Sequence, residues 1–169
     1  MTLLWHGDRP IGICVFAAPA ASLRLRNQFF KWQPSTLSDR PSACCAGSRS
    51  LRLKKLNQEL WLLARVVLHP TYRGAGVAAA FVRNSCATCP VPWIETLTAM
   101  GHLNPFFEKA GFVRVGVIRK DQRRMSIARH GRIYGGQARL SPETLRKSWY
   151  AEPVYYVFDN RQQLIAPHR

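Results

Sequence analysis

The fold of this chain is decided by the stretch Leu62-Leu-Ala-Arg-Val-Val-Leu-His-Pro-Thr-Tyr-Arg-Gly-Ala-Gly-Val-Ala-Ala-Ala-Phe81. An apolar strand passes here through a tight turn into a helix that opens on Gly74 and Gly76. Glycine leaves room for backbone to approach a ligand. The first N–H groups of a helix have no intrahelical acceptor and lie at the positive end of the helix dipole. The stretch therefore predicts a site for the diphosphate of an anionic cofactor.

Two blocks of sequence carry a family resemblance. In the first, Arg73-Gly-Ala-Gly-Val-Ala78 has the pattern Arg/Gln-x-x-Gly-x-Gly/Ala and follows Val-x-x-His-Pro-x-Tyr. In the second, the short apolar strand Pro92-Trp-Ile-Glu-Thr-Leu97 precedes Asn104-Pro-Phe-Phe-Glu-Lys-Ala-Gly-Phe112. With these blocks, which cover roughly residues 60 to 118, the chain resembles the GNAT superfamily of N-acetyltransferases. The second block is also similar to a GNAT-like domain that is sometimes fused to ABC-type ATPases.

This resemblance implies an α/β (α+β) fold and a cofactor. The fold is a mixed, mostly antiparallel twisted sheet with flanking helices and one splayed pair of parallel strands, and it is shortened at the N-terminus here. The cofactor is acetyl-CoA as acyl donor, with its pantetheine arm between the splayed strands. The residues that the resemblance assigns to the cofactor are Val66, Val67, Leu68, Arg73, Gly74, Ala75, Gly76, Val77, Ala78, Asn104 and Phe107.

Two other nucleotide-binding patterns fit less well. A Rossmann motif requires Gly-x-Gly-x-x-Gly and an acidic residue about twenty positions later. Here Ala79 takes the third glycine position, and the next acidic residue, Glu95, belongs to another predicted strand. A P-loop is excluded because no Gly-Lys-Ser/Thr follows the glycines.

Composition favours one basic, soluble domain. The 169 residues, 47% of them apolar, are enough for a single core. We expect a cytoplasmic protein, because the sequence has no long apolar run and no signal-peptide pattern at its start. The formal net charge of +16 attracts polyanions, among them acetyl-CoA and nucleic acid. The most basic stretch, Arg119 to Arg132, has Tyr134 as its nearest aromatic residue and does not suggest stacking on bases.

The five cysteines suggest no metal ion. Cys44-Cys45 and Cys86-Ala-Thr-Cys89 are an alternative zinc site, but no second Cys-x-x-Cys or histidine pair accompanies them. Cys86 and Cys89 also fall at the C-terminal end of the predicted helix, where the dipole disfavours a thiolate. We therefore expect buried or idle reduced thiols.

Outside the two blocks the chain predicts a hairpin, two insertions and a final strand. Leu3 to Phe16 predicts two strands around a Gly-Asp turn. The insertions cover about residues 24–55 and 119–150 of a single domain, 1–169. Residues 24–50 lack a hydrophobic period and predict a loop, followed by a short basic helix from Leu51. Three further elements are predicted: a strand over 113–118, a helix that Ser141-Pro-Glu-Thr opens, and a strand over 153–158 that pairs with the strand over 113–118.

The strand before the glycines has a regular apolar face. Its even positions from Leu60 to Leu68 are all apolar, which predicts that they face the core. A β-bulge in this strand would shift that parity.

Amide formation from a thioester requires a base for the amine and a proton for the leaving thiolate. Glu95 is the candidate general base; the alternative for its carboxylate is a structural ion pair with Arg65. The family often has a tyrosine as proton donor where this chain has Phe107. His102 and Tyr72 are therefore the candidate replacements.

Three functions stay open. The first is an acyl-CoA-dependent N-acetyltransferase, whose partner is an amine-bearing acceptor that the sequence does not identify. The second is a GNAT-like nucleic-acid modifier that resembles Mom-type phage proteins, with the two basic insertions on the phosphate backbone. The third is a binding module without catalysis. No membrane partner is expected, and no oligomeric interface is evident.

Overall fold

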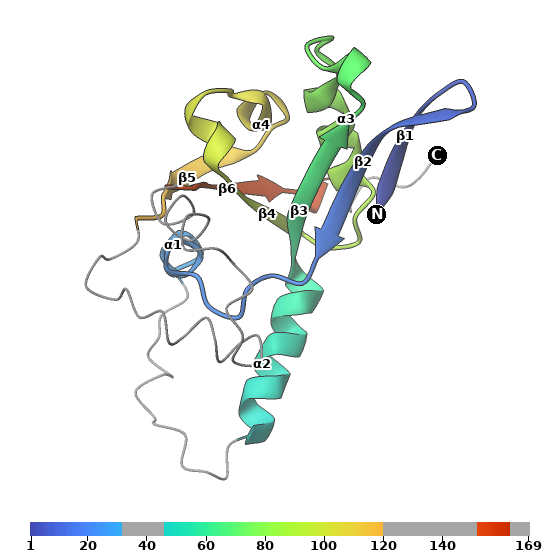
Figure 1. Ribbon diagram of the computed structural model, residues 1–169. Helices are drawn as coiled ribbons and strands as arrows, with labels where there is room; N and C mark the ends of the chain where they lie inside the picture. The colour runs from blue at the N-terminus through green and yellow to red at the C-terminus, as the bar shows by residue number, and fades with distance from the viewer. Residues whose placement is uncertain (32–45, 120–151, 163–169) are drawn as a thin grey trace, which may run out of the picture.

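The computed structural model describes residues 1–31, 46–119 and 152–162, and for residues 46–52 the backbone alone. Its centre is a six-stranded sheet with the strand order β1-β2-β3-β4-β6-β5 (Figure 1). The strands are β1 Thr2–His6, β2 Arg9–Ala17, β3 Leu60–Leu68, β4 Trp93–Thr98, β5 Val113–Val117 and β6 Val154–Asp159. The helices are α1 Arg24–Phe29, α2 Ala46–Glu59, α3 Val77–Ala87 and α4 Phe106–Lys109, and 3-10 turns cover Pro70–Tyr72 and Ala99–His102.

Among the described strands only β3 and β4 are parallel neighbours, and the other pairs are antiparallel. The predicted mixed α+β fold, with one parallel pair in a mostly antiparallel sheet, is therefore confirmed. So are the N-terminal hairpin and the pairing of the last strand, β6, with β5. β6 also pairs with β4, so the final strand lies inside the sheet rather than at its edge.

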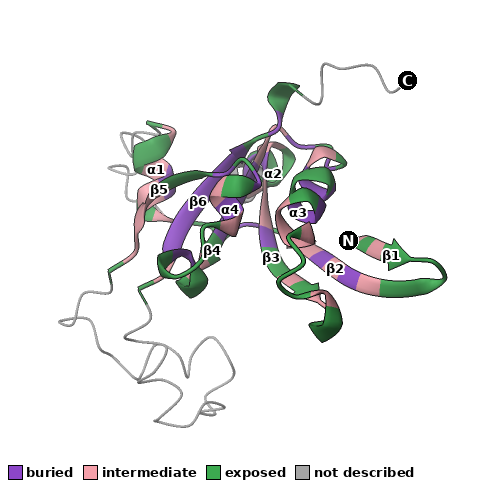
Figure 2. Ribbon diagram, turned by 90° about the horizontal axis from the view of Figure 1, so that it is seen from above, coloured by how far each residue is buried: buried purple, intermediate pink, exposed green. Residues whose placement is uncertain are grey.

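The hydrophobic core lies between one face of the sheet and the helices α3 and α4. Figure 2 shows β6 and the inner side of α3 as buried. From α3 the core takes Phe81, Val82 and Cys86, and from α4 it takes Phe107. The sheet contributes Cys14, Leu63, Ile94, Val154, Tyr156 and Phe158. Helix α3 thus packs by its apolar face, with Ala79 of its first turn against the core, while its N-cap residue, Gly76, is exposed.

A β-bulge in β3 makes the predicted parity wrong. Val15 pairs with Arg65, whereas the next residue, Phe16, pairs with Leu63, so Ala64 is the extra residue of β3. Before the bulge the odd position Leu63 is buried in the core, and after it the even positions Val66 and Leu68 pack there. The uniform apolar character of the even positions could not reveal this switch.

The predicted loop over residues 24–50 is wrong in its described parts. Residues 24–29 form α1, and α2 begins at Ala46 rather than at Leu51. The predicted helix near Ser141 and most of the basic stretch from Arg119 lie outside the described residues. No helix in the described ranges is long and apolar enough to cross a membrane.

Three cysteines are described, and all are buried free thiols. Burial raises the pKa of Cys14 and of Cys86, and raises that of Cys89 to about 11, so these thiols stay protonated at neutral pH. Within the described ranges no group of His, Cys, Asp and Glu could hold a metal ion. Cys44 and Cys45, the other half of the alternative zinc site, lie outside those ranges.

Candidate functional site

β3 and β4 pair over three residues and then part. Their register is Leu60 with Trp93, Trp61 with Ile94 and Leu62 with Glu95. Leu63 and Thr96 would form the next pair, and instead the Thr96 hydroxyl donates a hydrogen bond to the Leu63 carbonyl at 2.9 Å. We call this point, between Leu62–Glu95 and Leu63–Thr96, the fork. Beyond it the remainder of β3 pairs with β2 alone among the described strands.

The backbone of β3 beyond the fork has hydrogen-bonding groups on the side away from β2. The His69 N–H donates to the Ile11 carbonyl at 2.7 Å. Residues of an antiparallel ladder alternate in direction, so Val67, paired with Ile13, directs its N–H and C=O toward β2. Val66 and Leu68 direct theirs to the side where β4 has parted. Of the three residues predicted to meet a pantetheine arm through their backbone, these two have the appropriate orientation.

The glycine loop at the end of β3 has the conformation that its sequence requires. Gly74 and Gly76 have φ of 85° and 77°, a region that favours glycine. A Cβ built on either residue would meet no atom within 4 Å, so the space around both is open. No side chain of the described residues caps α3, whose N-cap is Gly76. The first amides of α3 are therefore available to an anion.

Arg73 is exposed and stands beside this loop. Its Nε donates to the Leu68 carbonyl at 3.2 Å, which holds the guanidinium against the end of β3. The positive charge of Arg73 therefore lies at the end of β3, three residues before Gly76, the N-cap of α3.

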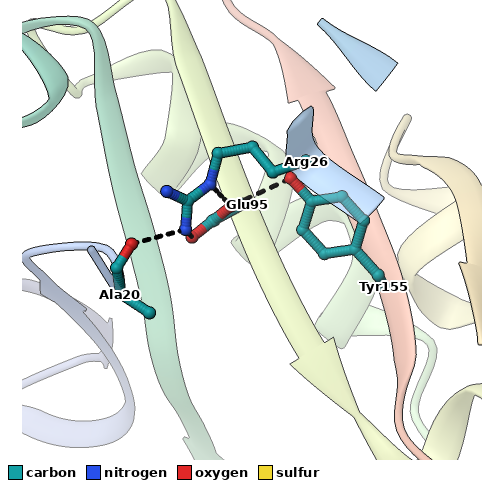
Figure 3. A network of polar contacts seen from close by, with 4 residues as sticks. All are labelled: Ala20, Arg26, Glu95 and Tyr155. Atoms are coloured by element: carbon teal, nitrogen blue, oxygen red, sulfur yellow. Dashed lines mark hydrogen bonds and ion pairs between the residues drawn. The ribbon is translucent and has the colours of Figure 1, made fainter. Parts of the chain in front are cut away.

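Glu95 is buried at the fork in a network that joins three elements (Figure 3). Arg26 of α1 donates from Nε to Oε2 at 3.0 Å and from Nη2 to Oε1 at 3.1 Å. The Tyr155 hydroxyl of β6 donates to Oε2 at 2.9 Å. Arg26 also donates to the Ala20 carbonyl at 2.7 Å. The network ties α1 and β6 to the last residue of β4 that pairs with β3.

This network corrects the expected partner of Glu95. Arg65 is exposed on β3, and the buried ion pair is made with Arg26 instead. Burial and then the Glu95 charge raise the pKa of Tyr155, so its hydroxyl stays a donor at neutral pH. A carboxylate that accepts three hydrogen bonds while excluded from solvent is suited to positioning more than to proton abstraction.

His102 lies at the other end of β4, in the turn that follows it. It is exposed, and its Nε2 is 2.7 Å from the Glu152 carbonyl. A carbonyl only accepts hydrogen bonds, so Nε2 carries the proton, and the Nδ1 of neutral His102 has a free lone pair. Glu95 is three residues before the end of β4, a separation of about 10 Å along the strand. The predicted catalytic residues Glu95 and His102 are therefore not in one cluster.

Tyr72 follows the end of β3, as His102 follows the end of β4. Because the two strands are parallel, the two turns lie at the same edge of the sheet. The Tyr72 hydroxyl is 2.6 Å from His6 Nδ1, and its ring makes edge contacts with His6 and His69. Tyr72 thus fastens the tip of the β1–β2 hairpin to the turn that precedes the glycine loop.

Phe107 and Asn104 are placed differently from each other. The Phe107 ring is buried against Phe106, Phe112 and Tyr156, with centroid distances of 4.1, 5.3 and 5.6 Å. Asn104 is exposed before α4. The nearest phenol to Phe107 in this stack is that of Tyr156, which donates to Glu108 Oε1 at 2.8 Å; burial and this contact raise its pKa to about 12.

The sequence did not indicate Arg26, Tyr155 or Thr96 as site residues. Arg26 lies in a segment without hydrophobic period, and its partner is 69 residues away in the chain. The one available signal was Glu95 itself, because an acidic residue inside an apolar strand must find a partner when buried.

Comparison with known proteins gives one weak match. No family model matches the chain, and no curated protein matches its sequence. Among solved structures, a chimera of the spermidine N-acetyltransferase SpeG from Vibrio cholerae with hSSAT is similar over 90% of this chain and 99% of that chain. The TM-score is 0.41 and the sequence identity is 12%. The function of this chain therefore has to be inferred from the geometry of its own residues.

Proposed function

We propose that this chain is an N-acetyltransferase that takes its acetyl group from acetyl-CoA and transfers it to an amine. The observation that carries the proposal is the fork: β3 and β4 part after three residue pairs, and the end of β3, free on its β4 side, leads through a short turn and the glycine loop into a helix without a side-chain cap. An extended chain that ends in a diphosphate matches both features, because it meets strand backbone first and helix amides second.

The residues present fit that coenzyme. Val66 and Leu68 would pair their backbone groups with the amides of the pantetheine arm. The amides from Gly74 to Ala78 would hold the diphosphate, with Arg73 adding positive charge. Bound acetyl-CoA supplies an activated acyl group, and the remaining chemistry belongs to the protein.

For proton transfer we assign His102. In its Nε2–H tautomer the free Nδ1 accepts the proton that the attacking amine loses, and the Glu152 carbonyl then stabilises the imidazolium through Nε2. The same imidazolium can return that proton to the thiolate that leaves. One residue thus serves as base and acid, which removes the need for a tyrosine where Phe107 stands.

Glu95 acts in this proposal by holding the fork in place. Its hydrogen bonds with Arg26 and Tyr155 fix the last residue of β4 that pairs with β3, and the hydroxyl of Thr96 fixes the next residue. The direction in which β4 leaves β3 is then set by buried contacts. Tyr72 has no role in the chemistry of this proposal, and its contact with His6 fastens the β1–β2 hairpin.

A substitution at Gly76 tests the diphosphate site. Gly76→Ala adds a Cβ in the open space where the ligand would approach, at a positive φ of 77°. We expect the dissociation constant of acetyl-CoA, measured by isothermal titration calorimetry, to rise about tenfold or more, which is about 1.4 kcal/mol. The backbone cost of a left-handed alanine, about 1–2 kcal/mol of stability, applies as well.

Gly7→Ala is the matched control. Gly7 has a positive φ of 57° and open space around it, but it lies in the turn between β1 and β2. It should lose similar stability and keep the affinity of the parent protein. Equal affinities in all three proteins would place the diphosphate elsewhere.

The other two functions separate from this one by binding assays. A rise in melting temperature with acetyl-CoA supports the acetyltransferase. A shift of duplex DNA that weakens steeply with salt, without such a rise, supports the nucleic-acid modifier instead. If the protein binds acetyl-CoA but releases no free CoA with any tested amine, the remaining function is the binding module without catalysis.

A further inference from the structure

The two edges of the sheet differ in how they are protected. At the β5 edge, Arg114 is exposed and the register shifts between Arg114 and Gly116. Leu25 of α1 also approaches this edge, 3.5 Å from where a Cβ on Gly116 would stand. A charge, a bulge and a covering helix are the usual means of preventing edge pairing. The β1 edge, Thr2–His6, has no Lys, Arg, Asp, Glu or Pro, and the extra residue of its bulge is on β2.

The backbone of β1 leaves two residues unpaired on its outer side. The Ile11 carbonyl of β2 accepts a hydrogen bond from His69, on the side of β3. Because backbone N–H and C=O groups alternate in direction along a strand, those of Gly12 and Cys14 point toward β1. Their partners Leu4 and Thr2 therefore point their N–H and C=O inward. Leu3 and Trp5 point theirs outward, where no described strand follows. The pairing of Trp5 with Pro10 agrees, because proline has no N–H to offer.

The side chains along this edge are apolar and exposed. Leu3 is 42% and Trp5 is 55% exposed, and two residues apart on one strand they share a face of the sheet. Leu3 pairs with Ile13, and Ile13 pairs with Val67, which is 47% exposed. An apolar surface on the face opposite α3 and α4 thus reaches the free edge of β1.

We propose that β1 pairs antiparallel with β1 of a second copy of this chain, which joins the two sheets into one. The register follows from the free groups. With Leu4 opposite Leu4 of the second copy, Leu3 stands opposite Trp5 of that copy, and the reverse. Because Leu3 and Trp5 both point outward, each such pair exchanges two backbone hydrogen bonds. In this register every outward backbone N–H and C=O group of Leu3 and Trp5 makes a hydrogen bond.

The side chains support the same register. Leu3 and Trp5 of opposite copies lie on one face as an aliphatic–aromatic cross-strand pair, formed twice by the two-fold axis. A generic extended peptide would match the backbone, but only a second β1 presents the reciprocal Leu and Trp at the right spacing. The strands are short, so the dimer should depend on protein concentration. Since both copies are strongly basic, salt should strengthen it by screening their repulsion.

Sedimentation equilibrium of the full chain tests the proposal. We expect a monomer–dimer equilibrium that shifts toward dimer as salt is raised. The double variant Leu3→Lys, Trp5→Lys should raise the dimer dissociation constant at least tenfold, because it brings the like charges of both copies together on one face of the pairing. Val113→Lys is the control: Val113 is 56% exposed on the opposite edge strand, and its substitution should leave the dimer unchanged.

Hydrogen exchange tests the register in the unmodified protein. Raising the concentration through the dimer range should slow exchange at the amides of Leu3 and Trp5 at least tenfold. The amide of Leu4, bonded to β2 in either state, should not change. The proposal is overturned by a chain that stays monomeric at its highest soluble concentration. It is equally overturned if added salt weakens the dimer, or if the double lysine variant still forms it. A dimer in which the amides of Leu3 and Trp5 exchange as fast as in the monomer overturns it as well.

Discussion

Replacing Arg26 with methionine is expected to lower the free energy of unfolding by about 3–5 kcal/mol, because it leaves a buried charge without its partner. Arg26 and Glu95 are each 1% exposed, and two of the three hydrogen bonds to the carboxylate come from the guanidinium. Methionine keeps most of the volume of the side chain. The loss therefore reports on the charge and its hydrogen bonds more than on a cavity.

Urea unfolding followed by tryptophan fluorescence measures this change. Arg161→Met is the matched control, because Arg161 also pairs with a carboxylate, Asp159, but at an exposed site. Arg161→Met should lower the free energy of unfolding far less, because water screens the exposed ion pair and hydrates Asp159 once its partner is gone. Similar losses in the two variants would mean that the fork does not depend on the buried network.

A double variant separates the structural part of Glu95 from any chemical part. Glu95→Gln alone leaves Arg26 as the unpaired buried charge, so a loss of activity in that variant would have two explanations. In Arg26→Met, Glu95→Gln both charges are gone, and the glutamine oxygen can still accept from Tyr155. We expect it to be more stable than either single variant and, under the proposed mechanism, to keep turnover.

The second large effect is expected at His102. Under the proposed mechanism His102→Ala should lower kcat about 10²- to 10⁴-fold, the range for loss of a general acid–base residue. The dissociation constant of acetyl-CoA should stay the same, because the ring lies beyond the end of β4 and contacts the Glu152 carbonyl. Release of CoA thiol with a panel of primary alkyl amines, peptide amino termini and adenine nucleotides measures this effect.

His6→Ala is the control for His102. His6 is also exposed and hydrogen-bonded, but to Tyr72 at the hairpin tip, and it should leave kcat within a few fold. Unchanged turnover in His102→Ala, or loss in both variants, would remove His102 from the mechanism.

The sequence predicted the strands and the glycine loop because their signals are local. Gly74 and Gly76 require positive φ by themselves, and an apolar run between turn residues is sufficient to indicate a buried strand. The parity of β3 was mispredicted, because the bulge at Ala64 arises from pairing with β2 and leaves no mark in the strand. The partner of Glu95 was also missed, because a contact between α1 and β4 depends on how the sheet is assembled rather than on any pattern near Arg26.

The hydroxyl of Thr96 has a kinetic consequence. By satisfying the Leu63 carbonyl it ends the ladder with a side chain, so no main-chain bonds between β3 and β4 must break before a ligand enters. Under the proposed function, no preceding conformational change then lowers the affinity for the coenzyme, and the rate of association is governed by diffusional encounter. For a polyanion approaching a chain of charge +16, that encounter is accelerated by long-range attraction and slowed by added electrolyte.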